Sequence, residues 1–180
     1  WNGTCWTEVA DLNTARNNGG GAGDTNTACL MFGGLAAPAV TANTELWNGT
    51  SWSEKNNLNT ARSNQGEFGS AASAVSCGGN GPTNATEEWT GAGAPISGWA
   101  TGGNLNTARF QLGAAGTGTA GLAITGTADP PYYAQTESYD GTSWTEVNDV
   151  NTARSFVASF GTQTSALVTG GNAGGAALGN

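Results

Sequence analysis

The run Leu12-Asn13-Thr14-Ala15-Arg16 decides the fold of this 180-residue chain, because close copies of it end at Arg62, Arg109 and Arg154. These arginines follow one another at intervals of 46, 47 and 45 residues. A tryptophan stands ten residues before each arginine: Trp6, Trp52, Trp99 and Trp144. Self-similarity at a fixed period of this length is typical of proteins built from repeated supersecondary units. The chain therefore contains four units of about 46 residues.

Each unit reads as four short strands. In the first, the apolar run 27–32 ends at Gly33-Gly34, and the segments 44–47 and 51–54 flank the pair Asn48-Gly49. Asn-Gly between strand-like segments predicts a two-residue hairpin corner, because both central residues accept positive φ. Helical periodicity is missing, and Gly and Thr at this density disfavour helices. The sequence predicts an all-β fold with four antiparallel strands in each unit.

An apolar strand that ends in a Gly pair, then an aromatic residue, a Trp, and an Arg ten residues later resembles the kelch motif of β-propellers. The resemblance covers essentially the whole chain, although Thr125 replaces the first Gly of the third pair and Trp replaces the usual Tyr in three units. It implies a kelch-like β-propeller with blades at approximately 16–55, 62–101, 109–147, and 154–180 plus 1–8. The near-identical short runs are also similar to low-charge kelch-like proteins of environmental bacteria and phages.

The phase of the repeat leaves two ways to complete the last blade. The chain starts within the third and fourth strands of one unit and stops after the second strand of another. In the first way, the N-terminal strands complete the cut blade and close a four-bladed ring, which removes exposed sheet edges. Alternatively, a neighbouring unit completes it in a longer array or a head-to-tail assembly, and we expect a homo-oligomer or larger assembly.

The repeated polar and aromatic residues are expected to build the fold. All four arginines of the chain are repeat arginines, and a guanidinium can join loop carbonyls to a carboxylate. The Thr-Glu pairs supply natural partners in Glu45, Glu87 and Glu137. The repeat tryptophans are expected to fill the wedge between adjacent blades. Structural roles are therefore predicted for Arg16, Arg62, Arg109, Arg154, Trp6, Trp52, Trp99, Trp144 and these three glutamates, with ligand binding or sugar stacking as the alternatives.

Composition excludes several function classes. The formal net charge is −8, which argues against nucleic acid as a partner, and no apolar run approaches the length of a membrane helix. His is absent, which removes the usual general base and the commonest metal ligand. The copper oxidases of the kelch class need His ligands and a redox Tyr–Cys pair, so an enzyme of the kelch oxidase type is kept only as the least favoured alternative. Asp24, Asp129 and Asp149 fall in predicted loops without the spacing of a calcium motif, and we predict no metal, no cofactor and no enzymatic activity.

Residues that the repeat does not explain are the candidates for recognition. The clearest are Asp129, Tyr132 and Tyr133, which flank two prolines in a predicted loop. Adjacent tyrosines beside prolines form a stiff amphipathic patch that can stack on a sugar or peptide, or pack against a neighbouring loop. The insertion 90–98 is expected on the opposite face, where Pro95 and Ile96 either contact another subunit or belong to a drifting loop.

Two function classes follow. The first is a non-catalytic recognition or structural propeller on a virion or extracellular surface, such as a phage fibre or host-attachment module that binds a glycan or protein receptor. The second is an intracellular kelch adaptor that binds a peptide.

The cysteines, Cys5, Cys29 and Cys77, show no metal-binding spacing and are expected to be small buried or half-buried residues. Asn2, Asn48 and Asn84 match glycosylation sequons, which the turns at the first two positions also explain.

Overall fold

The computed structural model describes residues 1–91, 97–174 and 176–179, and within these residues every regular element is a β-strand. The prediction of an all-β fold is confirmed. Three antiparallel sheets have four strands each. Sheet 1 contains β1 (Gly20–Thr25), β2 (Ala28–Phe32), β5 (Thr44–Trp47) and β6 (Trp52–Lys55); sheet 2 contains β7 (Gly66–Gly69), β8 (Ser73–Cys77), β9 (Thr86–Thr90) and β10 (Gly98–Thr101); sheet 3 contains β11 (Gly113–Thr117), β12 (Ala120–Ile124), β13 (Thr136–Tyr139) and β14 (Trp144–Val147).

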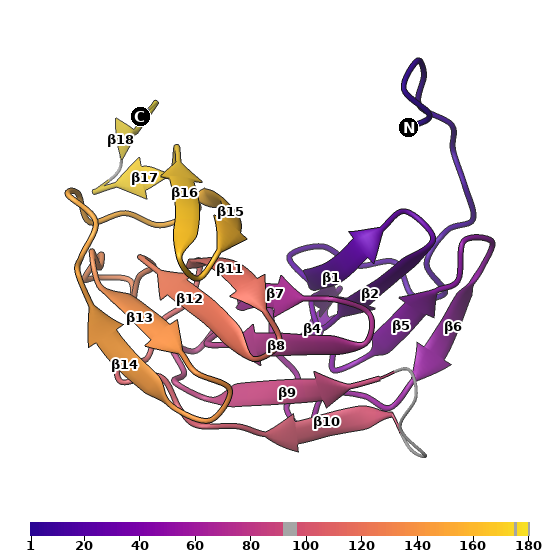
Figure 1. Ribbon diagram of the computed structural model, residues 1–180, viewed down its shortest axis with the longest axis horizontal. Coiled ribbons are helices and arrows are strands. Elements are labelled where there is room, and N and C mark those ends of the chain that lie inside the picture. Colours follow the sequence, from indigo (N-terminus) through magenta and orange to yellow (C-terminus); the bar gives the residue numbers. More distant parts are fainter. Residues whose placement is uncertain (92–96, 175, 180) are drawn as a thin grey trace.

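The fourth unit is a hairpin of two strands, β15 (Ala158–Thr162) and β16 (Ser165–Thr169). Two smaller hairpins follow Gly pairs: β3 (Leu35–Ala36) with β4 (Ala39–Val40), and β17 (Asn172–Ala173) with β18 (Ala176–Ala177). The sheets stand side by side in an arc, and the N-terminal segment and the C-terminal hairpins lie on opposite sides of its opening (Figure 1).

The first strand of each sheet is its innermost strand, and consecutive first strands pack against one another in the order β1, β7, β11, β15. Equivalent residues are also joined head to tail by main-chain hydrogen bonds. The N–H of Asn64 donates to the carbonyl of Asn18 at 2.9 Å, that of Gln111 to Asn64 at 2.8 Å, and that of Phe156 to Gln111 at 2.9 Å. The repeat therefore sets both the sheets and the way in which they join.

The corner between the third and fourth strands differs from the predicted two-residue turn. Trp47 pairs with Trp52, which leaves a four-residue loop, and only Gly49 of that loop has positive φ. The Asn48 side-chain oxygen accepts the N–H groups of Thr50 and Ser51, both at 2.9 Å. The Asn side chain thus stabilises the corner by an Asx-type turn instead of adopting positive φ itself.

The Gly pairs bring one unit close to the next. Gly33 has φ +62°, and a Cβ there would lie 2.6 Å from the carbonyl oxygen of Arg62. At Gly78, with φ +67°, a Cβ would lie 2.4 Å from the Arg109 carbonyl oxygen. The N–H of the second glycine in each pair donates to the same arginine carbonyl: Gly34 to Arg62 at 2.8 Å and Gly79 to Arg109 at 3.0 Å. Glycine is required here because a side chain would separate adjacent units.

Apolar side chains fill the two spaces between complete sheets. Between sheets 1 and 2, Phe32 meets Trp99 with ring centroids 4.8 Å apart. Between sheets 2 and 3, Phe68 meets Trp144 at 6.1 Å. The buried clusters are Ala22, Leu30, Phe32, Leu58, Ala74, Trp89 and Trp99 in the first space, and Phe68, Val75, Cys77, Leu105, Leu112, Ala123, Tyr139 and Trp144 in the second.

The fourth unit lacks this cover. Phe160 occupies the repeat position of the buried Phe68 but is 59% exposed, and Leu167 occupies that of Leu30 but is 61% exposed. Residues 1–12, all of which the structure describes, form no strand. The N-terminal residues 1–8 therefore do not complete the last sheet here. The expectation that Trp6 packs in a core is wrong for this structure, because its side chain has no sheet to join and is 83% exposed.

Candidate functional site

Three repeat arginines form buried ion pairs with the predicted glutamates. The distances are 2.7 Å for Arg16 with Glu45, 2.6 Å for Arg62 with Glu87, and 2.8 Å for Arg109 with Glu137. Each guanidinium also donates to main-chain carbonyls; that of Arg62, for example, reaches Gly78 at 3.1 Å and Ala85 at 2.9 Å. These contacts occupy the guanidinium groups within the fold.

The same glutamates hold the segment that leads into each sheet. Their second carboxylate oxygen accepts the N–H of the repeat asparagine, at 2.7 Å for Asn13, 2.6 Å for Asn59 and 2.7 Å for Asn106. Burial lowers the pKa of Arg16 and Arg109, and the facing Glu45 and Glu137 oppose that shift. Arg154 donates to the carbonyls of Gly170 at 3.1 Å and Thr152 at 3.2 Å. The charged side chains of the repeat therefore join segments of the fold to one another.

The repeat tryptophans Trp99 and Trp144 cross from one sheet to the preceding one. Their indole N–H groups donate to Thr44 at 2.9 Å and Thr86 at 3.1 Å, respectively. The indole of Trp52 donates instead to the carbonyl of Ala10 at 3.1 Å. Sugar stacking on Trp99 or Trp144 is disfavoured by this geometry, because both rings are buried.

The predicted tyrosine patch forms a structured loop after β12. Tyr132 and Tyr133 are half-buried, whereas Asp129 is exposed with φ +57°. The main chain of Tyr133 is held on both sides: its N–H donates to Gly126 at 2.8 Å, and its carbonyl accepts the N–H of Arg154 at 3.1 Å. The loop therefore offers two partly covered rings and one exposed carboxyl at its tip.

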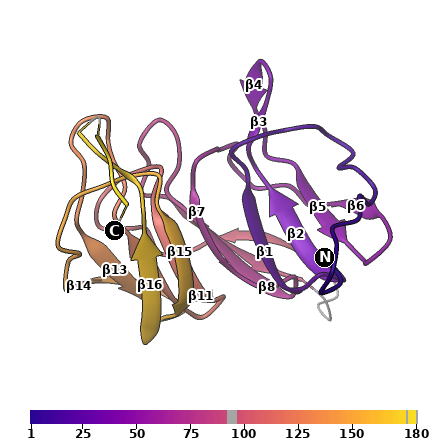
Figure 2. The ribbon, with the colours of Figure 1, turned by 90° about the horizontal axis from the view of Figure 1, so that it is seen from above.

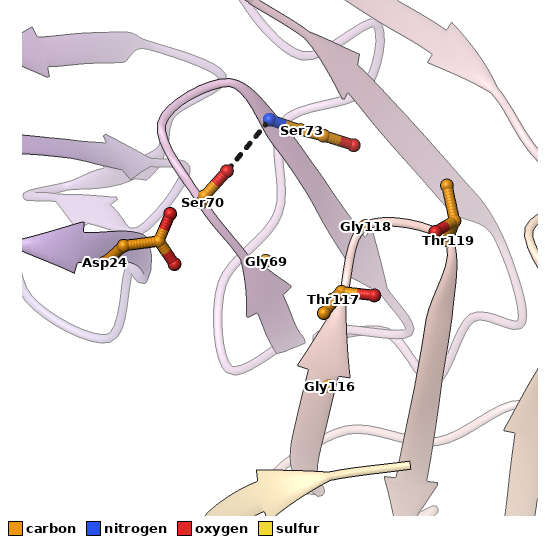
Figure 3. A pocket seen from close by; sticks show the side chains of 8 residues that line it. All are labelled: Asp24, Gly69, Ser70, Ser73, Gly116, Thr117, Gly118 and Thr119. Carbon is orange, nitrogen blue, oxygen red and sulfur yellow. Dashed lines mark hydrogen bonds between the residues drawn. The ribbon is translucent and has the colours of Figure 1, made fainter.

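A second polar site lies at the turns between the first two strands of consecutive units. Asp24 at the end of β1, the β7–β8 turn and the β11–β12 turn line a pocket of about 260 Å³ (Figure 3). The two turns approach so closely that a Cβ at Gly118 would lie 2.1 Å from the Ser73 hydroxyl oxygen. The lining residues are Asp24, Gly69, Ser70, Ser73, Gly116, Thr117, Gly118 and Thr119.

Most of the polar side chains in this pocket are not used by the fold. Ser70 accepts the N–H groups of Ala72 and Ser73 at 3.2 and 3.3 Å. By contrast, no hydrogen bond within the described residues engages the side-chain oxygens of Asp24, Ser73, Thr117 or Thr119. A carboxylate and several hydroxyl groups therefore remain available around one small concavity.

The pocket and the tyrosine loop lie at opposite ends of the units. Thr117 pairs with Ala120 beside the β11–β12 turn, and β12 then runs from that turn to Ile124, where the tyrosine loop begins. Sequence reasoning named the tyrosine loop and noted Asp24 only as a loop aspartate, which is wrong because Asp24 lies within β1. It did not bring Asp24 together with the turns of the next two units. The predicted contact of Pro95 and Ile96 falls outside the described residues.

The cysteines differ in exposure. Cys77 is buried, and burial raises its pKa to about 12. Cys29 is half-buried and its pKa is also raised by burial. The expectation of burial is wrong for Cys5, which is exposed because residues 1–12 pack into no sheet.

Clusters of metal-binding side chains and membrane-length apolar helices are both absent from the residues that the structure describes. No group of three or more His, Cys, Asp or Glu residues among them is placed to hold a metal ion. No helix in the same part of the chain is long and apolar enough to cross a membrane.

Comparisons of the sequence with protein-family models and with curated proteins found no match.

Proposed function

We propose that this chain is a non-catalytic recognition module of the kelch-type β-propeller class, which serves on a virion or extracellular surface as part of a phage fibre or host-attachment protein and binds a glycan. The pocket lined by Asp24, Ser73, Thr117 and Thr119 is the observation that carries the proposal. The buried repeat arginines and tryptophans support it indirectly, because they are occupied in joining the sheets.

The propeller part of the proposal rests on how the units join. The same head-to-tail hydrogen bond and the same packing of first strands recur at all three junctions between the four units. In a propeller, the hairpin β15–β16 gains its third and fourth strands from the N-terminal segment or from a neighbouring unit. Residues 6–9 read Trp-Thr-Glu-Val, which is identical to Trp144–Val147 of β14. Thr136 of β13 stands where Thr44 and Thr86 stand in the preceding sheets, so it is the natural acceptor for the Trp6 indole.

Trp6→Ala tests this completion. If Trp6 enters the fourth sheet of the assembled protein, the substitution costs several kcal/mol, as Trp144→Ala does in a formed sheet (about 3–5 kcal/mol). The two variants are compared by thermal unfolding at matched concentrations. A Tm of Trp6→Ala equal to that of the parent chain would remove the proposed completion by this segment.

A glycan suits the pocket because sugars present many hydroxyl groups that donate to a carboxylate and exchange hydrogen bonds with Ser and Thr hydroxyls. The sheets hold the surrounding turns in place, which reduces the ordering cost of binding. The acidic net charge of −8 disfavours strongly anionic sugars, so neutral saccharides are the expected class.

A glycan array tests the proposal with two sets of variants. Asp24→Asn and Ser73→Ala alter the pocket, while Tyr132→Ala and Tyr133→Ala alter the loop at the opposite end. We expect binding of a neutral saccharide that is lost in the pocket variants and kept in the tyrosine variants. Loss only in the tyrosine variants would move the site to the loop and contradict the assignment of the pocket. An array without saccharide binding would contradict the glycan function.

A further inference from the structure

A second cavity lies on the common axis of the units, between their innermost strands. The second residue of each of these strands lines it: Gly21 of β1, Glu67 of β7, Ala114 of β11 and Ser159 of β15. Its volume is about 330 Å³. We refer to it as the axial cavity. Three units place Gly, Ala or Ser at this position, so the repeated fold does not need the carboxyl that the second unit places there.

Glu67 has no partner in the cavity. No hydrogen bond or ion pair joins its carboxyl to another of the described residues. The polar side chain at the equivalent position of the fourth unit is already used, because the Ser159 hydroxyl accepts the N–H of Ala114 at 2.8 Å and donates to the Ala114 carbonyl at 2.9 Å. This differs from Glu45, Glu87 and Glu137, each of which receives a guanidinium and main-chain N–H groups.

Glu67 is half-buried, and an unpaired carboxyl that is partly removed from water costs free energy, which a bound cation would offset. A divalent cation is a poor fit, because it needs several oxygen ligands, and among the described residues that line the cavity only Glu67 carries a carboxyl. The other lining residues include Leu112 and Val157, which offer apolar surface beside the carboxyl. A carboxylate beside apolar side chains matches a ligand that carries an ammonium group on an alkyl stem.

We propose that the axial cavity binds an alkylammonium group, such as a lysine side chain or the end of a polyamine, with Glu67 as its counter-ion. The ammonium N–H groups donate to the Glu67 carboxylate, and the alkyl stem lies against Leu112 and Val157. This proposal is independent of the glycan pocket, which lies at the turns between the strands and contains none of these residues.

Binding of a cation is coupled to the proton on Glu67. Burial raises the pKa of Glu67 to about 8, so below that pH the cation must displace a proton. The affinity should therefore rise up to about tenfold for each pH unit between pH 6 and 8, and level off above pH 8. Among the strands packed against β7, β1 carries Asp24 and β8 carries Cys77, whereas β11 has no titratable residue.

Isothermal titration with n-butylammonium chloride tests the proposal, with sodium chloride at the same ionic strength as the reference. We expect one site per chain at pH 8 and an affinity that falls at least tenfold in Glu67→Gln. Glu8→Gln is the matched control, because it makes the same change in charge at an exposed residue that does not line the cavity. Ala114→Leu keeps the carboxyl but fills the cavity, so it should also weaken binding.

Carbon-13 NMR of the Glu67 carboxyl provides a second measurement on the unmodified chain. Butylammonium should lower the apparent pKa of Glu67, whereas sodium should not. Equal binding by the parent chain and a folded Glu67→Gln variant would overturn the proposal. So would a Glu67 titration that butylammonium leaves unchanged.

Discussion

The indole N–H of Trp144 in β14 donates a hydrogen bond to the hydroxyl of Thr86 in β9 at 3.1 Å, and both side chains are buried. Trp99 in β10 makes the same contact with Thr44 in β5 at 2.9 Å. A donor on the outermost strand of one sheet thus reaches the third strand of the preceding sheet. Because the two partners lie 58 residues apart in the sequence, this contact fixes how adjacent sheets are placed.

Thr86→Val should therefore destabilise the chain. The substitution keeps the shape of the side chain but leaves a buried indole N–H without an acceptor, which costs about 1–3 kcal/mol. Chemical denaturation monitored by tryptophan fluorescence measures the loss. Thr50→Val, at an exposed loop position, is the control. A Thr86→Val variant as stable as this control would show that the indole bond contributes nothing.

Arg62→Ala should lower the Tm sharply, because it leaves the Glu87 carboxylate buried without its guanidinium. Removing one partner of a buried ion pair costs about 3–5 kcal/mol. Arg62→Lys should recover only part of the loss, since an ammonium cannot reach the Gly78 and Ala85 carbonyls and the carboxylate with the same fork. Differential scanning calorimetry compares the three proteins, and an unchanged Tm for Arg62→Ala would remove the structural role of this arginine.

Thr125→Gly should stabilise the chain by about 1 kcal/mol. Thr125 has φ +60°, a conformation that costs a β-branched residue about 1–2 kcal/mol and that glycine adopts freely. Its hydroxyl is also buried without a hydrogen-bond partner. The other three units place glycine here. The reverse substitution, Gly78→Thr, should be strongly destabilising because its Cβ would meet the Arg109 carbonyl oxygen. The urea unfolding midpoint should rise for Thr125→Gly and fall for Gly78→Thr. A Thr125→Gly variant that is less stable than the parent chain would show that Thr125 is not strained.

Stability should decrease as the pH rises from about 4.5 to 8, in part because of Glu67. Burial raises its pKa from 4.5 to about 8, so the folded chain holds a proton that the unfolded chain releases within this range. The resulting contribution to stability is complete below pH 4.5 and is lost as the pH passes 8. Glu67→Gln should flatten this slope, which urea unfolding at pH 5 and pH 8 can measure. Parallel slopes for the two proteins would show that Glu67 titrates normally.

Cysteine labelling should follow exposure in the order Cys5, Cys29, Cys77. Cys5 is exposed, whereas burial raises the pKa of Cys77 to about 12 and removes it from reagent. Brief treatment with iodoacetamide at pH 8, followed by peptide mass spectrometry, should modify Cys5 and leave Cys77 intact until the chain unfolds. Protection of Cys5 in the assembled protein would indicate that the N-terminal segment has entered a sheet.

Local pattern accounts for much of the fold. The period of about 46 residues predicted the four units, and strand patterning predicted four antiparallel strands, which three units form. The Thr-Glu pairs pointed to the carboxylates that meet the arginines. The position of the corner at Asn48 was predicted correctly, but its turn type was not. The sequence does not show that the Asn side chain accepts the main-chain N–H groups of the corner.

The amino-acid sequence by itself determined the number of units, their all-β character and the residues that join one unit to the next. These features depend on short-range periodicity and on side-chain types that recur. Only the tertiary structure decided that Trp6 lies in solvent, that Asp24 meets the turns of two later units, and that Glu67 faces an axial cavity without a partner. These outcomes depend on how consecutive sheets pack around a shared axis. That packing is set by contacts between residues far apart in the chain, which no local pattern encodes.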